Sequence, residues 1–257
     1  MKTNLIGYRN LFIAFMVISL FLIIWECLVF IKNIPVYLLP SPSFVFRILL
    51  TEKAQFISAA GITLGEALGG LLIGVCLGCL IASLVLLAPS LEGGVMTLSI
   101  LLKSTPMVVL APLLTLWLGF GVLPKLIITA LLTFFPVVIN LISGFSSVDS
   151  SLVDLFRSWQ SGSWRIFTLL RVPSAVPYLF ASLRICAPLS LIGAVVAEWT
   201  GASGGLGRLM WLAYSNLNLP YLFGGIFILS AFGMAFYLCL TWLEKKVVFW
   251  VPGRQEF

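Results

Sequence analysis

Long apolar runs without a charged residue are the feature that most constrains this chain. Lys, Arg, Asp and Glu are absent from residues 67–91, 104–124, 126–148 and 209–243. A helix that crosses the ~30 Å hydrocarbon core of a bilayer needs about 20 apolar residues. Charged side chains make up 9% of the chain, against about 25% in a soluble domain. The sequence therefore predicts a multi-pass membrane protein and excludes a soluble enzyme.

Two further apolar stretches contain isolated charges, namely Glu26 in one and Arg184 and Glu198 in the other. With them we predict an all-α membrane protein of six transmembrane helices, forming a single domain over residues 1–257. A short inner loop at residues 88–103 and a tight outer turn at 119–125 are expected. The predicted spans cover residues 10–31, 59–87, 104–118, 124–144, 178–199 and 220–243.

The positive charges indicate an orientation rather than a nucleic-acid partner. The formal net charge is +6, but the Lys and Arg residues are scattered singly apart from Lys245 and Lys246. Cytoplasmic loops of membrane proteins are enriched in Lys and Arg, which favours both termini on the cytoplasmic side. The spans between them are expected to contact membrane lipid. The first apolar stretch follows Lys2 and Arg9 like a signal peptide, but it is long and lacks a small-residue cleavage site, so we expect a retained span.

The residue types that most catalytic and metal sites need are scarce. The chain has no His, so Ser-His or Cys-His chemistry has no base and a metal has no imidazole ligand. The five Cys residues all lie in apolar spans, and no Gly is followed by Lys, which excludes a phosphate-binding P-loop. We therefore expect no catalytic residue, no metal site and no cofactor bound by this chain.

Ionisable side chains inside membrane spans mark candidate functional positions. We expect Glu26 and Glu66, near the outer ends of their helices, to reach the headgroups or a partner side chain. Arg184 and Glu198 lie about 21 Å apart on one helix and cannot pair. Glu198 either lines the outer mouth of a pathway or hydrogen-bonds the backbone of the Gly-rich segment after it. The candidate pathway residues are Asn140, Ser190 and Glu198.

Small residues are spaced four apart at Gly70, Gly74, Gly78 and Ala82. This spacing places them on one helix face, where another backbone can approach closely. Packing within the chain and contact with a second subunit are both open at this point.

The largest inner loop, residues 146–177, carries helix signals. Ser147 and Asp149 are typical helix starts, and apolar residues then recur in a helical pattern at Leu152, Val153, Phe156 and Trp159. Gly162 breaks the pattern, and a second short helix is expected up to Pro173. Such an amphipathic helix either lies on the membrane surface or fills a groove on a soluble partner.

This loop resembles that of permease subunits of bacterial ATP-binding-cassette importers. Their inner loop carries the triplet Glu-Ala-Ala, then after three residues a Gly, and then after nine more residues a branched apolar residue, any residue, Leu and Pro. At the same spacing this sequence has Asp154-Leu155-Phe156, then Gln160, and then Leu170-Arg171-Val172-Pro173. Other stretches resemble the nitrate, sulfonate and taurine branch, notably LAPLLTLWLGFG, TFFPVVINLISGFSSVD and LRICAPLSLIGAVVAEWTGASGGLG. In TLGEALGG, relatives of this branch more often have a basic residue where Glu66 stands.

The resemblance implies a type I importer permease in a bacterial cytoplasmic membrane, with a coupling helix between spans four and five. It implies as partners a second permease copy or related permease, an extracytoplasmic substrate-binding protein, and ATPase subunits that bind the ATP and Mg. Gln160 replaces the Gly of the motif, so Gly162 is expected to supply the break instead. The implied coupling residues are Asp154, Leu155, Phe156, Trp159, Gln160, Gly162 and Pro173.

Two other classes of membrane protein compete with this interpretation. An ion-coupled secondary transporter needs protonatable groups near the bilayer midplane, whereas the acidic residues of the spans lie near the outer face. An intramembrane enzyme lacks a His base, and Asp149 and Asp154 both lie in the inner loop. The importer interpretation predicts transport of a small polar or anionic solute, of the nitrate, sulfonate, taurine or vitamin-precursor class.

Overall fold

The computed structural model describes residues 2–250, apart from the side chains of residues 2–12, 14 and 15. No β-strand occurs in this part of the chain. The elements are α1 Lys2–Ile31, α2 Pro42–Thr51, α3 Lys53–Leu87, the 3₁₀-helix η1 Pro89–Leu91, α4 Glu92–Ser104, α5 Met107–Leu118, α6 Val122–Ser146, α7 Ser150–Ser158, α8 Ser163–Ile166, the π-helix η2 Phe167–Arg171, α9 Val172–Glu198, α10 Leu206–Ser215 and α11 Leu219–Val247.

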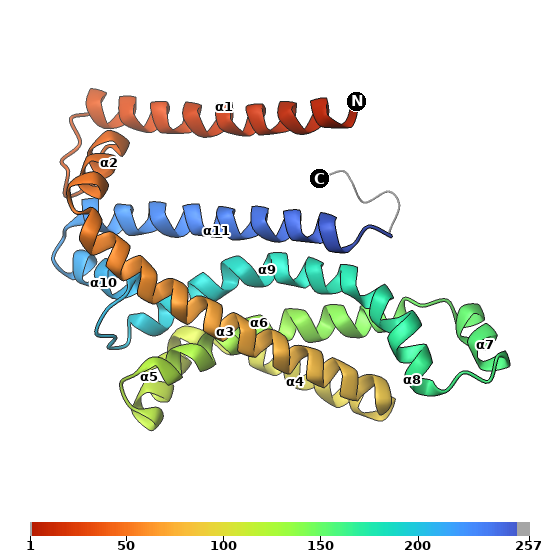
Figure 1. The fold of residues 1–257 in the computed structure, drawn as a ribbon. Coiled ribbons are helices and arrows are strands. Elements are labelled where there is room, and N and C mark those ends of the chain that lie inside the picture. Colours follow the sequence, from red (N-terminus) through yellow and green to blue (C-terminus); the bar gives the residue numbers. More distant parts are fainter. Residues whose placement is uncertain (1, 251–257) are drawn as a thin grey trace.

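The long helices run roughly along one direction, and α3 crosses over α6 (Figure 1). The start of α1, the end of α11 and helix α7 lie toward one end of the molecule, which we call the coupling end. Helices α2, α5 and α10 lie toward the opposite end, which we call the outer end. The side of a membrane that each end faces stays a prediction, as does the cytoplasmic position of both termini. Residues 1 and 251–257 lie outside the described residues.

Helices α6 and α9 form the centre of the bundle. In the most apolar 18-residue stretch of α6, half of the residues are buried, whereas no residue of the corresponding stretch of α11 is buried. The main apolar core lies where α3, α6 and α9 meet, and it includes Val85, Val138 and Cys186. A second cluster at the outer end packs Leu206 of α10 against Phe56 of α3. The apolar surface of α11 is thus left for lipid or another chain to cover.

The stripe of small residues on α3 packs against α6 of the same chain. A Cβ added at Gly78 would lie 2.7 Å from Val137 Cγ1, and one added at Gly74 would overlap Thr133. Such separations leave no space for a side chain, so the glycines let the two backbones approach closely. Of the two open alternatives, the structure shows packing within the chain.

The helical membrane fold is confirmed, but the count of six spans is not. Within the described residues, four helices are long and apolar enough to cross a membrane, namely α3, α6, α8 continued into α9, and α11. A bent pair of helices raises the number to five if it counts as one span. For α1, the part from Met16 to Ile31 is apolar but shorter than the usual crossing length.

The expected third span at residues 104–118 is wrong as a single crossing helix. Helix α5 has 12 residues, which gives about 18 Å at helical rise and cannot cross ~30 Å of hydrocarbon. The expected inner loop at residues 88–103 is instead mostly helix α4, and α4 and α5 meet at 93°. Pro106 explains the bend, because proline lacks an N–H and disfavours helical geometry at Thr105, which is extended with ψ 125.

Candidate functional site

Helix α7 forms where the sequence predicts a short helix in the inner loop. The Asp149 side chain caps it by accepting a hydrogen bond from the Ser151 N–H at 2.9 Å. This backbone donor lowers the pKa of the Asp149 carboxyl, because it stabilises the ionised form. The helix ends at Ser158, with Trp159 as its C-cap. Local signals in the sequence therefore fix both ends of α7.

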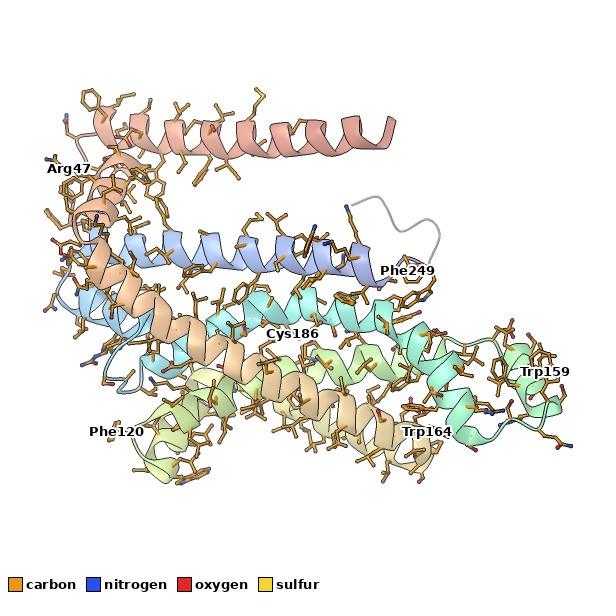
Figure 2. The ribbon with its side chains drawn as sticks, viewed as in Figure 1. Arg47, Phe120, Trp159, Trp164, Cys186 and Phe249 are labelled. Atoms are coloured by element: carbon orange, nitrogen blue, oxygen red, sulfur yellow. The ribbon has the colours of Figure 1, made fainter. Side chains whose placement is uncertain are left out.

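The coupling residues on α7 are largely exposed, and α7 lies beyond the end of the long helices (Figures 1 and 2). Leu155 is 44% exposed and Trp159 is 67% exposed, while Phe156 is half-buried with its ring 6.0 Å from that of Trp159. Among the described residues, the exposed Asp154 carboxylate pairs only with Arg157, at 3.4 Å. Residues 2–250 thus leave the apolar side chains of Leu155 and Trp159 uncovered.

Gly162 lies in the break between α7 and α8, as expected, but the left-handed backbone conformation after α7 is found at Gln160. Gln160 has a φ of 54°, in the left-handed region that glycine adopts readily. Gly162 has φ −65° and ψ 157°, an extended conformation open to any residue, and it is the N-cap of α8. Gln160 therefore keeps the backbone shape expected of the motif glycine, at the cost of strain.

The sequence predicts that the second helix of the loop ends at Pro173, but in the structure the helix continues past it. Helix α8 passes through the π-helix η2 into α9, giving a helical stretch over Ser163–Glu198. The Val172 N–H bonds the Phe167 carbonyl, the i→i+5 pattern of a π-helix. Because Pro173 has no N–H to donate, the wider hydrogen-bond pattern before it lets the helix continue.

Two of the three candidate pathway residues satisfy their polar groups within their own helix. The Asn140 amide donates to the Pro136 carbonyl at 2.7 Å, and the Ser190 hydroxyl donates to the Ala187 carbonyl at 2.8 Å. Ser190 is fully buried and Asn140 is partly buried. Their role in a pathway stays a prediction.

Glu198 is fully buried at the outer end. Its Oε1 accepts a hydrogen bond from the Thr63 hydroxyl at 2.7 Å, and its Oε2 accepts one from the Gly207 N–H. Of the two roles open to it, the hydrogen bond to the backbone of the Gly-rich segment is confirmed. A role at the mouth of a pathway stays a prediction.

Glu66 has a buried partner that the sequence did not reveal. The Lys125 ammonium at the start of α6 lies 2.5 Å from Glu66 Oε1, and only 5% of the Glu66 side chain is exposed. We call Thr63, Glu66, Lys125, Glu198 and Gly207 the outer cluster. The expectation that Glu66 pairs with a neighbouring helix is confirmed.

The other two charges in the spans also have partners. Glu26 accepts hydrogen bonds from the N–H and hydroxyl of Ser43, at 3.0 and 2.7 Å, near the start of α2. Arg184 pairs with Glu244 of α11 at 2.9 Å, which agrees with the prediction that it does not pair with Glu198. These partners belong to other segments of the chain, so the sequence around Glu26 or Arg184 does not predict them.

A cavity of about 190 Å³ lies between α3, α6 and η2, near the base of the coupling loop. It is lined by apolar side chains together with Glu92, Ser146 and Arg171. None of the candidate pathway residues Asn140, Ser190 and Glu198 lines it.

An all-helical bundle of apolar spans with an exposed loop helix defines a multi-pass membrane protein. The chain belongs to the family described as binding-protein-dependent transport system inner membrane component, whose model matches residues 74–249. It is thus an importer permease, a transport subunit rather than an enzyme, which rules out the ion-coupled secondary transporter and the intramembrane enzyme.

Two relatives and one solved structure illustrate the membership. The chain is 34% identical to the formylaminopyrimidine transport permease ThiX of Halalkalibacterium halodurans, covering 89% of this chain and 92% of that one. It is 29% identical to the aliphatic sulfonates transport permease SsuC of Bacillus subtilis, covering 88% and 83%. A chain of the inward-facing MetNI methionine ABC transporter superposes with a TM-score of 0.68 at 14% identity, covering 77% of this chain and 98% of that one. The last likeness shows the fold alone.

Proposed function

We propose that this chain forms the membrane pathway of an ATP-driven importer and that α7 is its coupling helix. The single observation that carries the proposal is the exposed apolar surface of α7, formed by Leu155 and Trp159 at the coupling end. In water, an apolar surface of this kind favours burial against a partner. A helix that presents such residues suits a groove on a soluble protein.

The proposed partner at α7 is an ATPase that binds the ATP and Mg. Closure of two ATPase subunits around nucleotide moves α7, and α8 transmits the movement through η2 into α9, because these segments form one helical stretch. The membrane helices then shift between inward and outward access, as a two-state element biased by a ligand. A second permease copy or a related permease completes the pathway.

The proposed cargo is a small polar or anionic solute of the nitrate, sulfonate, taurine or vitamin-precursor class. The names of two relatives support this range, one for formylaminopyrimidine and one for aliphatic sulfonates. A substrate-binding protein on the outer side delivers the solute and selects it. The higher identity to the formylaminopyrimidine permease favours a vitamin precursor as the first solute to test.

Affinity purification of the tagged chain from cells, in mild detergent, tests the proposal. We expect an ATPase to co-purify with the wild type and to be lost from the double variant Leu155→Asp and Trp159→Asp, with solute uptake reduced at least tenfold. Leu217→Asp is the matched control, since Leu217 is 69% exposed but lies in the turn between α10 and α11. An ATPase retained by the double variant with undiminished uptake would overturn the coupling role of α7.

A further inference from the structure

The outer cluster contains more acidic groups than basic ones. Glu66 of α3 and Glu198 of α9 each contribute a carboxyl, and Lys125 of α6 contributes the one ammonium. The residues are 4%, 0% and 7% exposed, in the same order. With all three ionised, the cluster carries one uncompensated negative charge out of reach of water. Burial of an unpaired charge costs far more free energy than its hydrogen bonds return.

The hydrogen bonds show which oxygen lacks a partner. Both Glu198 oxygens accept hydrogen bonds, from Thr63 and from the Gly207 N–H. Glu66 Oε1 pairs with Lys125, whereas Glu66 Oε2 is buried with no hydrogen-bond partner in the described residues. Glu66 lies one helical turn after Thr63 on the same face of α3, and Thr63 donates to Glu198, so the Glu66 carboxyl faces that of Glu198. Two buried carboxylates that face each other, one of them with an unpartnered oxygen, need a shared proton or a cation.

No other charged group on the surrounding helices offers the missing positive charge. On α9, Arg184 lies about 21 Å from Glu198 along the helix and pairs with Glu244. On α10, Arg208 is half-exposed and makes no ion pair in the described part of the chain. Lys53 lies at the start of α3, more than three turns from Glu66, and α5 carries no charged residue.

We propose that Glu66 and Glu198 share one proton, which makes the outer cluster electrically neutral. The shared proton thereby links α3 to α9 at their outer ends, where the Glu66–Lys125 pair already links α3 to α6. The proton comes from water as the chain folds, and a neutral carboxyl then donates an O–H to the facing carboxylate. Thr63 adds a further link, because its hydroxyl donates to Glu198 while accepting from the Leu206 N–H at 2.7 Å. This proposal does not depend on the ATPase partner or on the solute.

The proposal gives stability a defined dependence on pH. The folded chain keeps a proton that the unfolded chain releases above about pH 4.3, so stability is greatest in acid and falls as the pH rises until the folded chain loses the proton. For a chain of this size the expected fall in melting temperature is about 3 °C per pH unit in that window. Glu66→Gln and Glu198→Gln each replace the shared proton with a permanent N–H donor, so both are expected to remove this dependence.

The experiment measures melting temperature from about pH 5 to pH 9 for the full chain in lipid nanodiscs. The control is Glu92→Gln, at an exposed Glu of the coupling end, which is expected to keep the wild-type slope. Equal slopes for wild type, Glu66→Gln and Glu198→Gln would overturn the proposal. A melting temperature that rises when Na⁺ replaces a bulky organic cation at constant ionic strength would also overturn it, because a metal cation would then supply the charge.

A second measurement holds even if the Gln variants fail to fold. Infrared spectroscopy of the wild type at neutral pH detects the C=O stretch of a protonated carboxylic acid, which shifts in D₂O. We expect this band in the wild type and in Glu92→Gln. Its absence from the wild type would overturn the proposal.

Discussion

The two ends of the molecule treat their charged side chains in opposite ways. At the outer end, Lys125 and Glu66 form an ion pair whose side chains are 9% and 5% exposed, whereas at the coupling end the side chains of Arg157 and Asp154 are 67% and 71% exposed. The outer cluster satisfies its charges inside one chain. The coupling end leaves both its charges and its apolar residues exposed. The difference indicates that the outer cluster is a contact within this chain, whereas the exposed surface of α7 suits the partner proposed above.

The largest expected effect comes from breaking the buried pair. Lys125→Met leaves the Glu66 carboxylate buried without its cation, and removal of one partner of a buried pair costs about 3–5 kcal/mol. Arg157→Met is the matched change at the exposed pair, where such pairs contribute about 0–1 kcal/mol. Thermal melting of both variants in nanodiscs measures the contrast. Similar losses from the two variants would mean that the ends do not differ in this way.

A smaller loss is expected where α3 packs against α6. In Gly74→Ala the new Cβ meets Thr133 and lies 2.7 Å from the Ala130 carbonyl oxygen, and overpacking of this kind costs about 1–3 kcal/mol. Gly61→Ala is the control on the same helix, because a Cβ there has nothing within 4 Å. Removing a helical glycine in open space stabilises by about 0.5–1 kcal/mol. A lower melting temperature for Gly74→Ala and a higher one for Gly61→Ala would support the close packing of α3 against α6. A change in the same direction for both variants would contradict it.

The same contrast explains how far the sequence led. Helix α7 was predictable because its signals are local: the Asp149 cap, the apolar spacing from Leu152 to Trp159, and the break before Gly162 lie within one loop. The contacts of the outer cluster could not be predicted in this way, because they join residues far apart in the sequence. Lys125 and Glu66 are 59 residues apart, and Thr63 and Glu198 are 135 residues apart. The residues of the cluster were visible as charges in apolar spans. Only the fold shows that they meet.

The broken third span shows a different limit. The run from Ser104 to Pro124 is uncharged throughout, but it holds only the 12-residue α5 and the start of α6, and α5 meets the preceding α4 at 93°. Hydropathy alone does not reveal where such a run bends. Pro106 can bend a helix, but the size of the bend depends on what packs around it. Gln160 is a similar case, since a residue name does not reveal a φ of 54°. In both cases the backbone geometry comes from tertiary context.

A gain of stability is expected at the coupling end, in the turn after α7. Gln160→Gly places glycine at a positive φ, and the left-handed conformation costs a non-glycine residue roughly 1–2 kcal/mol. Part of that gain is lost to the greater freedom of glycine in the unfolded chain, which leaves about 0.5–1 kcal/mol. Hydrogen exchange of the α7 amides measures the effect, with slower exchange expected. Ser158→Gly, inside α7, is the control and is expected to speed exchange.

The smallest expected effect is the response of α7 to acid. The folded-state pKa of Asp149 is lowered by the Ser151 N–H, so its contribution is present at neutral pH and is lost as the pH falls through the ordinary carboxyl range toward the folded value. Asp149→Asn keeps a side-chain oxygen suited to the N-cap but does not titrate. Amide exchange in α7 is expected to speed up in acid, relative to the exchange of α6, in the wild type and to stay constant in Asp149→Asn. Because this cap is exposed and the outer cluster is buried, acid loosens the coupling end while it supplies the proton that the outer cluster holds. An equal acid response in the wild type and in Asp149→Asn would show that the Asp149 cap does not cause the response of α7, and would remove the cap from this contrast.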